Sequence, residues 1–82
     1  MSQDAQAHAP HVHSHDQTLL RMAGQIAIFF RSYPDAEAVD GIADHINRFW
    51  SKKMRLDFIA AFKPDDVRLD ARLSKAMGHL RR

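Results

Sequence analysis

Four histidines near the N-terminus are the first residues whose type and spacing could do chemistry. His8, His11, His13 and His15 lie close together in the sequence. Neutral imidazoles at this spacing can bind nickel, copper or zinc. A dedicated metal site also needs fixed geometry and supporting groups, which a flexible segment does not supply. We therefore interpret residues 1–15 as a disordered His-rich tail, and we expect neither a metal site nor a catalytic residue in this chain.

A second group of polar residues lies in the middle of the chain. Asp44 and Arg48 have the four-residue spacing of an ion pair on one helix face. His45 is the sequence neighbour of Asp44, so the two side chains point in different directions on a helix and cannot form a catalytic dyad. The sequence contains no Gly-rich phosphate-binding loop either. This group therefore favours binding over catalysis.

The residues that follow are of the types that dominate protein-binding hot spots. Trp50 stands among basic residues that include Arg48 and Arg55. We expect Phe49 to belong to the core row of its helix, and we expect the larger Trp50 ring to serve both the core and an interface. This end of the helix is therefore a candidate contact surface for another protein.

Helices must position these residues, and the first is predicted over residues 18–32. Its apolar residues recur at three- and four-residue steps and form one face. At about 100° per residue, Gly24 and Ile28 fall on the opposite side. A glycine beside an exposed apolar residue permits close approach by another backbone, although one exposed apolar residue is also common. Gly24 and Ile28 are therefore a candidate secondary contact patch.

Three further helices are expected. Pro34 breaks the first helix and Asp35 can cap the second, which is predicted over residues 36–51 and folds back antiparallel. A third helix over residues 53–62 either continues the second or bends away from it. Asp65 or Asp66 can cap a fourth helix. The predicted fold class is all-α, a small domain of three to four helices over residues 16–82, built on an antiparallel helical hairpin.

The composition indicates that some apolar surface meets another chain. The sequence has 82 residues and no Cys, but five Phe, one Trp, one Tyr and four Met. Below about 70–80 residues, one core rarely supplies more than about 3–5 kcal/mol without disulfides, metal or a partner. No apolar run approaches the roughly 20 residues that span a bilayer, and no signal peptide is present. We expect a cytoplasmic protein with no membrane contact.

Charge is divided unevenly along the chain. Residues 1–47 hold two basic and six acidic residues, whereas residues 48–82 hold ten basic and four acidic residues. A basic half can bind nucleic acid, and the alternative function is a free-standing basic helical protein that binds nucleic acid or acts as a regulator. No recognition helix, zinc finger or aromatic stacking platform accompanies the charge. An electropositive patch for a protein partner is therefore favoured over nucleic acid.

Two blocks of sequence resemble a known family, the small delta subunit of molybdenum- or tungsten-containing, NAD-dependent formate dehydrogenases. The first block is residues 21–26 (RMAGQI), followed by Phe29-Phe30 and Pro34. The second and more specific block is residues 39–50 (VDGIADHINRFW), followed by Met54-Arg55. The resemblance covers residues 19–80. The chain departs from the family pattern at Gly24, where we expect Asn, and in residues 63–68, which lack the expected glycines.

The resemblance implies a non-catalytic accessory subunit. Such a subunit would bind and stabilise, or help to mature, an enzyme that oxidises formate to carbon dioxide. The implied partner is the large catalytic subunit, with a molybdenum or tungsten pterin, iron–sulfur clusters and a flavin in the partner subunits and no cofactor in this chain. The residues expected to bind the partner are Asp44, His45, Arg48, Trp50 and Arg55, with Gly24 and Ile28 as the secondary patch.

Overall fold

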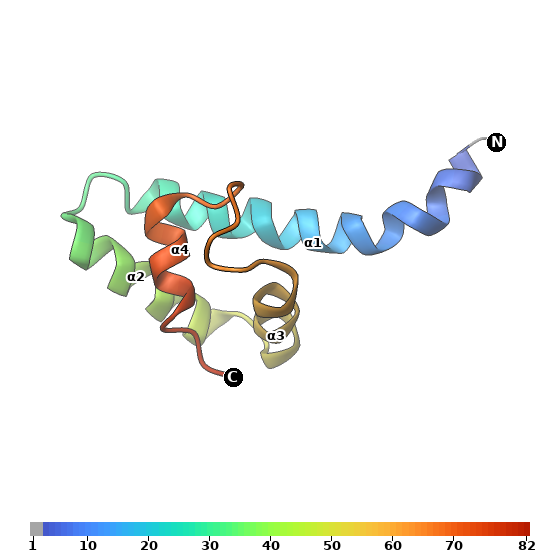
Figure 1. Cartoon of the computed structure of the whole chain (residues 1–82). Coiled ribbons are helices and arrows are strands. Elements are labelled where there is room, and N and C mark those ends of the chain that lie inside the picture. The colour runs from blue at the N-terminus through green and yellow to red at the C-terminus, as the bar shows by residue number, and fades with distance from the viewer. Residues whose placement is uncertain (1–2) are drawn as a thin grey trace.

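Four helices and no strand make up the part of the chain that the structure describes. The computed structural model describes the backbone of residues 3–82 and the side chains of residues 15–82. The helices are α1 (Gln3–Phe29), α2 (Asp35–Phe49), α3 (Lys52–Ala61) and α4 (Ala71–Met77) (Figure 1). The predicted all-α class is confirmed. The helix start expected at residue 18 falls inside α1. Of the expected disordered tail, residues 1–15, only the side chain of His15 is described, and the disorder stays a prediction.

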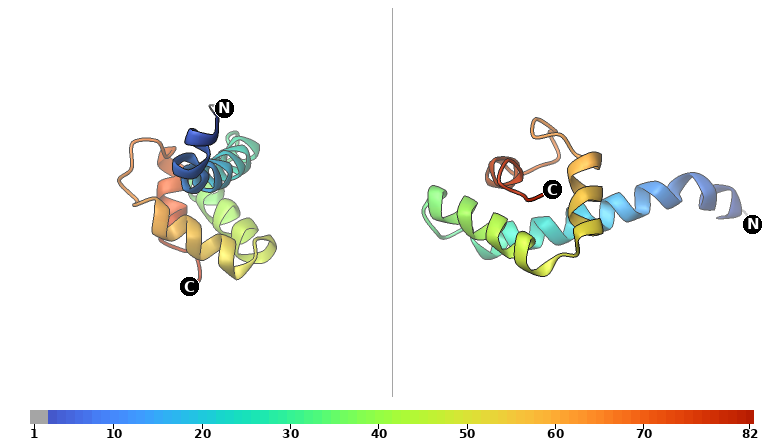
Figure 2. Two further views of the ribbon diagram at one scale, coloured as in Figure 1. Left: turned by 90° about the vertical axis from the view of Figure 1, so that its right-hand side faces the viewer. Right: turned by 90° about the horizontal axis from the view of Figure 1, so that it is seen from below.

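The predicted antiparallel hairpin is formed by α1 and α2. The short turn between Phe29 and Asp35 reverses the chain, so that α2 returns alongside α1 (Figure 1). Helix α4 packs mainly on α2 and also touches α1, whereas α3 lies across α1 (Figure 2). The hairpin is therefore covered on one side by two short helices that come from the C-terminal half of the chain.

Apolar side chains from all four helices form one core. The periodic residues of α2 supply Val39, Ile42, Ala43 and Ile46, which are buried as the helical spacing predicts. Phe58 of α3 continues the core between two flanking rings, since it lies 5.5 Å from Trp50 and 5.3 Å from Phe62 between ring centroids. The other core members, from α1, α4 and the C-terminal residues, are Leu19, Ala23, Ala27, Leu73, Ala76, Met77 and Leu80.

The Phe30 ring, which follows the end of α1, packs tightly against α2 at Gly41. A Cβ atom built on Gly41 would lie only 2.5 Å from Cε1 of Phe30, a distance that real Cβ atoms essentially never show. Any larger residue at this position must therefore displace the Phe30 ring. Glycine is less favourable than alanine inside a helix, but at this position it permits the close packing of the hairpin.

The chain bends between α2 and α3, which resolves the alternative left open by the sequence. Trp50 and Ser51 both have extended backbone angles, and the Ser51 hydroxyl accepts a hydrogen bond of 3.1 Å from the backbone N–H of Met54. This bond satisfies one of the free N–H groups at the start of α3. Helix α3 is therefore a separate helix with its own cap.

Two predicted helix caps are wrong. Helix α4 is capped by Asp70, which accepts a hydrogen bond of 2.9 Å from the Arg72 N–H, and not by Asp65 or Asp66. Asp66 instead binds the backbone N–H and the guanidinium of Arg68. Asp35 is the first residue of α2 and does not cap it, because its carboxylate is held by cations from α4.

Candidate docking surface

An apolar groove runs between α1 and α2, and we call it the aromatic groove. Its volume is about 400 Å³. Helix α1 supplies most of its lining, and His45 and Trp50 close it from the α2 side. The seven lining residues are Met22, Gln25, Ile26, Phe29, Phe30, His45 and Trp50. Because the helices approach closely at Gly41 but leave this space beside it, the groove is a feature of how the hairpin packs.

Two phenylalanine rings stand exposed beside this groove. Phe29 is 69% exposed and Phe49 is 71% exposed. The Phe49 ring rests against the imidazole of His45, with 4.8 Å between ring centroids, and the Phe29 ring meets Phe30 edge-on at 5.0 Å. The prediction that Phe49 belongs to the core is wrong. Its position is on the inner side of α2, but it is the last residue of that helix, and its ring contacts His45 instead of the core.

A polar edge accompanies the groove on the outer face of α2. The predicted ion pair is confirmed, since Arg48 Nε lies 3.2 Å from Asp44 Oδ1. Both side chains are mostly exposed, so the pair contributes little to the stability of the helix. His45, one residue along, faces the groove instead. His45 is partly exposed and Asp44 and Arg48 are mostly exposed, so these three predicted partner-binding residues remain accessible, on two neighbouring faces of α2.

The other two predicted residues of this group face inward. Trp50 is only 6% exposed, and its ring packs edge-on against Phe58 while also lining the aromatic groove. Arg55 donates one hydrogen bond to the Trp50 carbonyl and another to the Arg81 carbonyl, at 3.2 and 3.1 Å. The structure therefore gives Trp50 and Arg55 roles inside this chain, in the wall of the groove and at the end of α2.

Asn47 has a role that the sequence reading missed. Its amide nitrogen donates to the His79 carbonyl at 3.1 Å, and its amide oxygen accepts from the Arg81 N–H at 2.8 Å. The side chain thus holds the C-terminal residues onto α2 by their main chain. Asn47 belongs to the same sequence block as Asp44 and Arg48, but a lone Asn in a helix carries no signal of such a contact.

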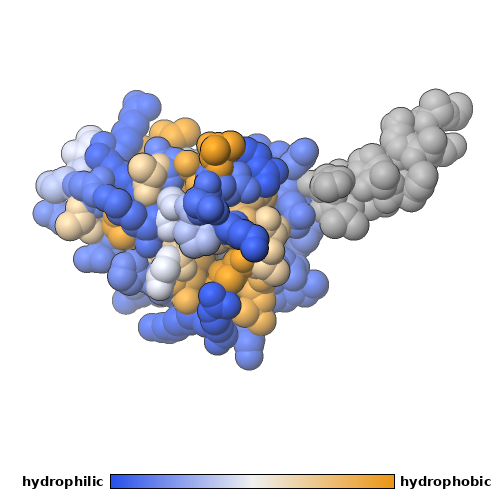
Figure 3. All heavy atoms as spheres, in the orientation of Figure 1, coloured by the Kyte–Doolittle hydropathy of each residue, from blue (hydrophilic) through white to orange (hydrophobic). Residues whose placement is uncertain are grey.

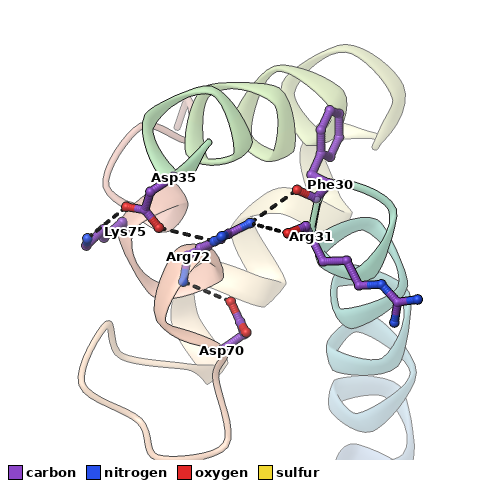
Figure 4. A network of polar contacts seen from close by, with 6 residues as sticks. All are labelled: Phe30, Arg31, Asp35, Asp70, Arg72 and Lys75. Carbon is purple, nitrogen blue, oxygen red and sulfur yellow. Dashed lines mark hydrogen bonds and ion pairs between the residues drawn. The ribbon is translucent and has the colours of Figure 1, made fainter. Parts of the chain in front are cut away.

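Arg72 joins three helices, a role that the sequence did not predict. Its Nη1 donates to the carbonyls of Phe30 and Arg31 at 3.2 and 3.1 Å, where α1 ends. Its Nε donates to Asp35 Oδ1 at 3.1 Å, where α2 begins. Figure 4 shows the guanidinium between these groups. We call this set of contacts, together with the bond of 3.2 Å from Lys75 to Asp35, the Arg72 clamp.

A second groove lies between α1 and α4, and we call it the α1–α4 groove. Its volume is about 370 Å³. Both members of the predicted secondary patch line it: Ile28 is 58% exposed, and a Cβ atom built on Gly24 would meet nothing within 4 Å. The other lining residues are Leu20, Ala27, Arg31, Arg68, Asp70 and Leu73. The placement expected for Gly24 and Ile28, away from the inner face of α1, is thus confirmed.

The acidic side chains with shifted pKa values are all paired with cations of this chain. A hydrogen bond from Lys75, together with Arg72, lowers the pKa of Asp35. Bonds from His15 and Lys53 lower the pKa of Asp57. Two bonds from Arg68 lower the pKa of Asp66 to about 2. These carboxylates therefore stay ionised at neutral pH and serve the contacts between helices and turns.

Many of the basic residues in the C-terminal half are also engaged within the chain. Six of the ten basic residues in positions 48–82 bond to carboxylates or main-chain carbonyls, namely Arg48, Lys53, Arg55, Arg68, Arg72 and Lys75. The positive charge of this half is therefore largely used in internal contacts. Hydrophilic side chains dominate the face seen in Figure 3, and hydrophobic ones reach the surface between α3 and α4.

The described residues contain neither a cluster of metal ligands nor a membrane-spanning helix. No three His, Cys, Asp or Glu side chains gather there as metal ligands. His15, the one tail histidine with a described side chain, bonds to Asp57 at 2.9 Å; His8, His11 and His13 lie outside the description. No helix of the described chain is both long and apolar enough to cross a membrane.

Comparison with known proteins identifies the family. The family model for the NADH-dependent formate dehydrogenase delta subunit FdsD matches residues 18–77, which is most of the chain. No curated protein and no solved structure is similar enough to count as a match. The matched region contains both sequence blocks that carried the resemblance, together with both grooves and the Arg72 clamp. The chain therefore belongs to the FdsD family of formate dehydrogenase delta subunits.

Proposed function

We propose that this chain is a non-catalytic accessory subunit that docks on the large catalytic subunit of a formate dehydrogenase. The aromatic groove and its polar edge, formed by Asp44, His45 and Arg48, make the contact. The partner subunits carry the molybdenum or tungsten pterin, the iron–sulfur clusters and the flavin. The chain then stabilises the catalytic subunit or assists its maturation.

The exposed rings beside the aromatic groove carry this proposal. Phe29 and Phe49 each leave more than two thirds of their surface in water. Large apolar groups gathered around a groove and rimmed by polar ones mark interaction sites, and aromatic residues are enriched at the centres of protein interfaces. Covering both rings would add to the stability that this small core supplies alone.

The use of the charged groups supports binding over catalysis. Asp35, Asp57 and Asp66 have lowered pKa values because cations of the same chain hold them. A general acid or base that works near neutral pH needs a pKa close to that pH, which these carboxylates move away from. They act as fixed anions between helices, as expected in a scaffold that presents a surface.

Removal of the exposed rings tests the proposal most directly. The double variant Phe29→Ala, Phe49→Ala is co-expressed with the catalytic subunit, and recovery through a tag on that subunit is measured. Loss of two central aromatic contacts should weaken the complex at least about thirtyfold. The matched control is Val67→Ala, since Val67 is 96% exposed but lines neither groove. Unchanged recovery of the double variant would contradict the proposal.

The composition of the recovered complex separates a subunit from a maturation factor. A fixed ratio of this chain to a metal-loaded catalytic subunit supports a permanent subunit. Recovery with only the metal-free catalytic chain supports a role in maturation. Trp50→Ala is not a suitable variant for either test, because Trp50 is buried against Phe58 and its removal would damage the fold.

A further inference from the structure

Gly24 is a glycine that the fold of this chain does not require. A glycine inside a helix is less favourable than alanine, so it usually answers a need for close packing. Gly41 has such a need, since a Cβ there would collide with the Phe30 ring. At Gly24 the space is open, with nothing within 4 Å of the added Cβ. The packing within this chain therefore gives no reason for a glycine at position 24, and a contact that needs one would come from another chain.

The surroundings of Gly24 form a surface on which a helix can lie. Gly24 lines the α1–α4 groove, whose apolar lining includes Leu20, Ala27 and Leu73. Ile28, one turn further along α1, is 58% exposed and lines the same groove. A glycine on a helix surface lets a second helix axis come close, while the flanking apolar side chains pack against its sides.

The charges around this groove favour an acidic occupant. Arg31 and Arg68 line it, and Asp70 is the one acidic residue among the lining residues. Asp70 is already bound to the first turn of α4, and Arg68 is held by Asp66. Within residues 15–82 the Arg31 guanidinium makes no ion pair, and Figure 4 shows it directed away from the Arg72 clamp. One cation beside the groove is therefore available to a carboxylate of a partner.

We propose that the α1–α4 groove binds an acidic amphipathic helix of another subunit of the formate dehydrogenase complex, with its backbone crossing α1 at Gly24. This proposal rests on the proposed function, because it assumes that the chain is a docked subunit. A second copy of this chain is disfavoured, since a symmetric contact brings the same patch against itself and would place Arg31 and Arg68 against their own copies.

The absence of cysteine allows a direct test of coverage. Ile28→Cys introduces one thiol on the proposed surface, and Val67→Cys introduces one on an exposed loop outside both grooves. Both thiols should react with a maleimide in the free chain. In the purified complex, Ile28→Cys should be protected at least about tenfold while Val67→Cys stays reactive. Equal reactivity of Ile28→Cys in the free and the assembled chain would overturn the proposal.

Gly24→Ala separates a partner contact from a structural role, because the two effects have opposite signs. In the free chain the added methyl meets nothing and favours the helix, so the Tm should rise by about 4–8 °C. In the complex the same methyl pushes the partner backbone away, and affinity should fall about tenfold. The control is Gly78→Ala, whose Cβ makes an ordinary contact at the end of α4. Unchanged affinity of the Gly24→Ala variant for the complex would mean that no partner backbone lies close to α1 at Gly24.

Charge reversal tests the acidic character of the partner. Arg31→Glu should weaken assembly at least about tenfold, because it opposes a carboxylate of the partner. Arg21→Glu is the matched control, since Arg21 is exposed on the same helix but lines neither groove. Equal effects of the two reversals would overturn the charge argument.

Self-association of the free chain through Ile28 is a separate outcome. It would be seen as an Ile28→Cys disulfide dimer that Gly24→Ala suppresses. That result would identify a second copy as the occupant and overturn the assignment to another subunit.

The two proposals fail in different ways. If the wild-type chain does not assemble with the enzyme, the proposed function fails and this inference fails with it. If the wild-type chain assembles and Phe29→Ala, Phe49→Ala disrupts the complex, while Gly24→Ala and Arg31→Glu do not, then only the α1–α4 groove is excluded.

Discussion

The Arg72 clamp and the aromatic groove meet at one residue, Phe30, and use it in opposite ways. The Phe30 carbonyl accepts a hydrogen bond from Arg72, within a set of polar groups that come from α1, α2 and α4. The Phe30 ring lines a groove whose neighbouring rings, Phe29 and Phe49, are left in water. The clamp satisfies polar groups inside the chain, whereas the groove leaves apolar groups for another chain to cover. Stability therefore depends on the residues of the clamp and docking on the residues of the groove, and Phe30 belongs to both.

Loss of the clamp should have the largest effect on stability. Arg72→Ala removes a charged donor from the Arg31 carbonyl and from the Phe30 carbonyl, which keeps only its bond from the Tyr33 N–H, and hydrogen bonds from charged groups contribute about 1.5–3 kcal/mol. We expect a loss of about 2 kcal/mol in the free energy of unfolding and a decrease in Tm of about 10 °C. The Tm is measured by circular dichroism. Lys75→Ala, which removes only the exposed pair with Asp35, should lower the Tm much less; equal effects would show that the carbonyl contacts do not matter.

Gly41→Ala should have the next largest effect, and it should connect the two regions. The new methyl would lie 2.5 Å from the Phe30 ring and must push it, at a cost of about 1–2 kcal/mol. Chemical denaturation should show this loss, and binding to the catalytic subunit should also weaken because the ring lines the groove. A variant with reduced stability but full affinity would mean that the ring position does not shape the docking surface.

Acid should weaken both the Arg72 clamp, through Asp35, and the contact between Asp66 and Arg68. The folded-state pKa values of Asp35 and Asp66 lie below their usual values, so the folded chain binds fewer protons than the unfolded chain near pH 3–4. The stability from these groups is complete above about pH 4 and is lost as the pH falls toward about 2. The Tm measured against pH should decrease over that range. Asp66→Asn should have a shallower decrease, and an unchanged slope would contradict this account.

The polar edge of the groove should have the smallest effect on stability. Arg48→Ala removes an exposed pair on α2, which contributes about 0.2–0.5 kcal/mol. The Tm should change by no more than about 3 °C, within the range of an exposed helix pair. Affinity for the catalytic subunit, measured by calorimetry or surface plasmon resonance, should nevertheless fall. If affinity and Tm change in proportion, Arg48 is a residue of the fold and not of the interface.

Periodicity in the sequence predicts the helices well where burial is continuous. Helix α2 was expected over residues 36–51 and spans Asp35–Phe49, and its inner residues Ile42 and Ile46 are fully buried. The same rule fails for Phe49, because a helical wheel places side chains around one helix but does not say where the neighbouring helix leaves a gap. The wheel also placed Ile28 on the exposed side, and there the prediction is confirmed.

Capping and long-range polar contacts were harder to predict. Asp65, Asp66 and Asp70 have the same capping chemistry, and the choice among them depends on the contact between Asp66 and Arg68. Arg72 has partners about 40 residues away in the sequence, so no local pattern marks it. Those residues come together only through the way α4 packs on the hairpin.

The attachment of the C-terminal residues has a consequence for how this sequence can vary. Asn47 binds the main chain at positions 79 and 81, and only the side chain of Leu80 is buried there. Evolutionary constraint should therefore rest on Asn47 and Leu80, while positions 79 and 81 tolerate most residues other than proline at 81, which lacks the N–H that Asn47 binds. A collection of related sequences would show this as one invariant asparagine opposite a variable terminus.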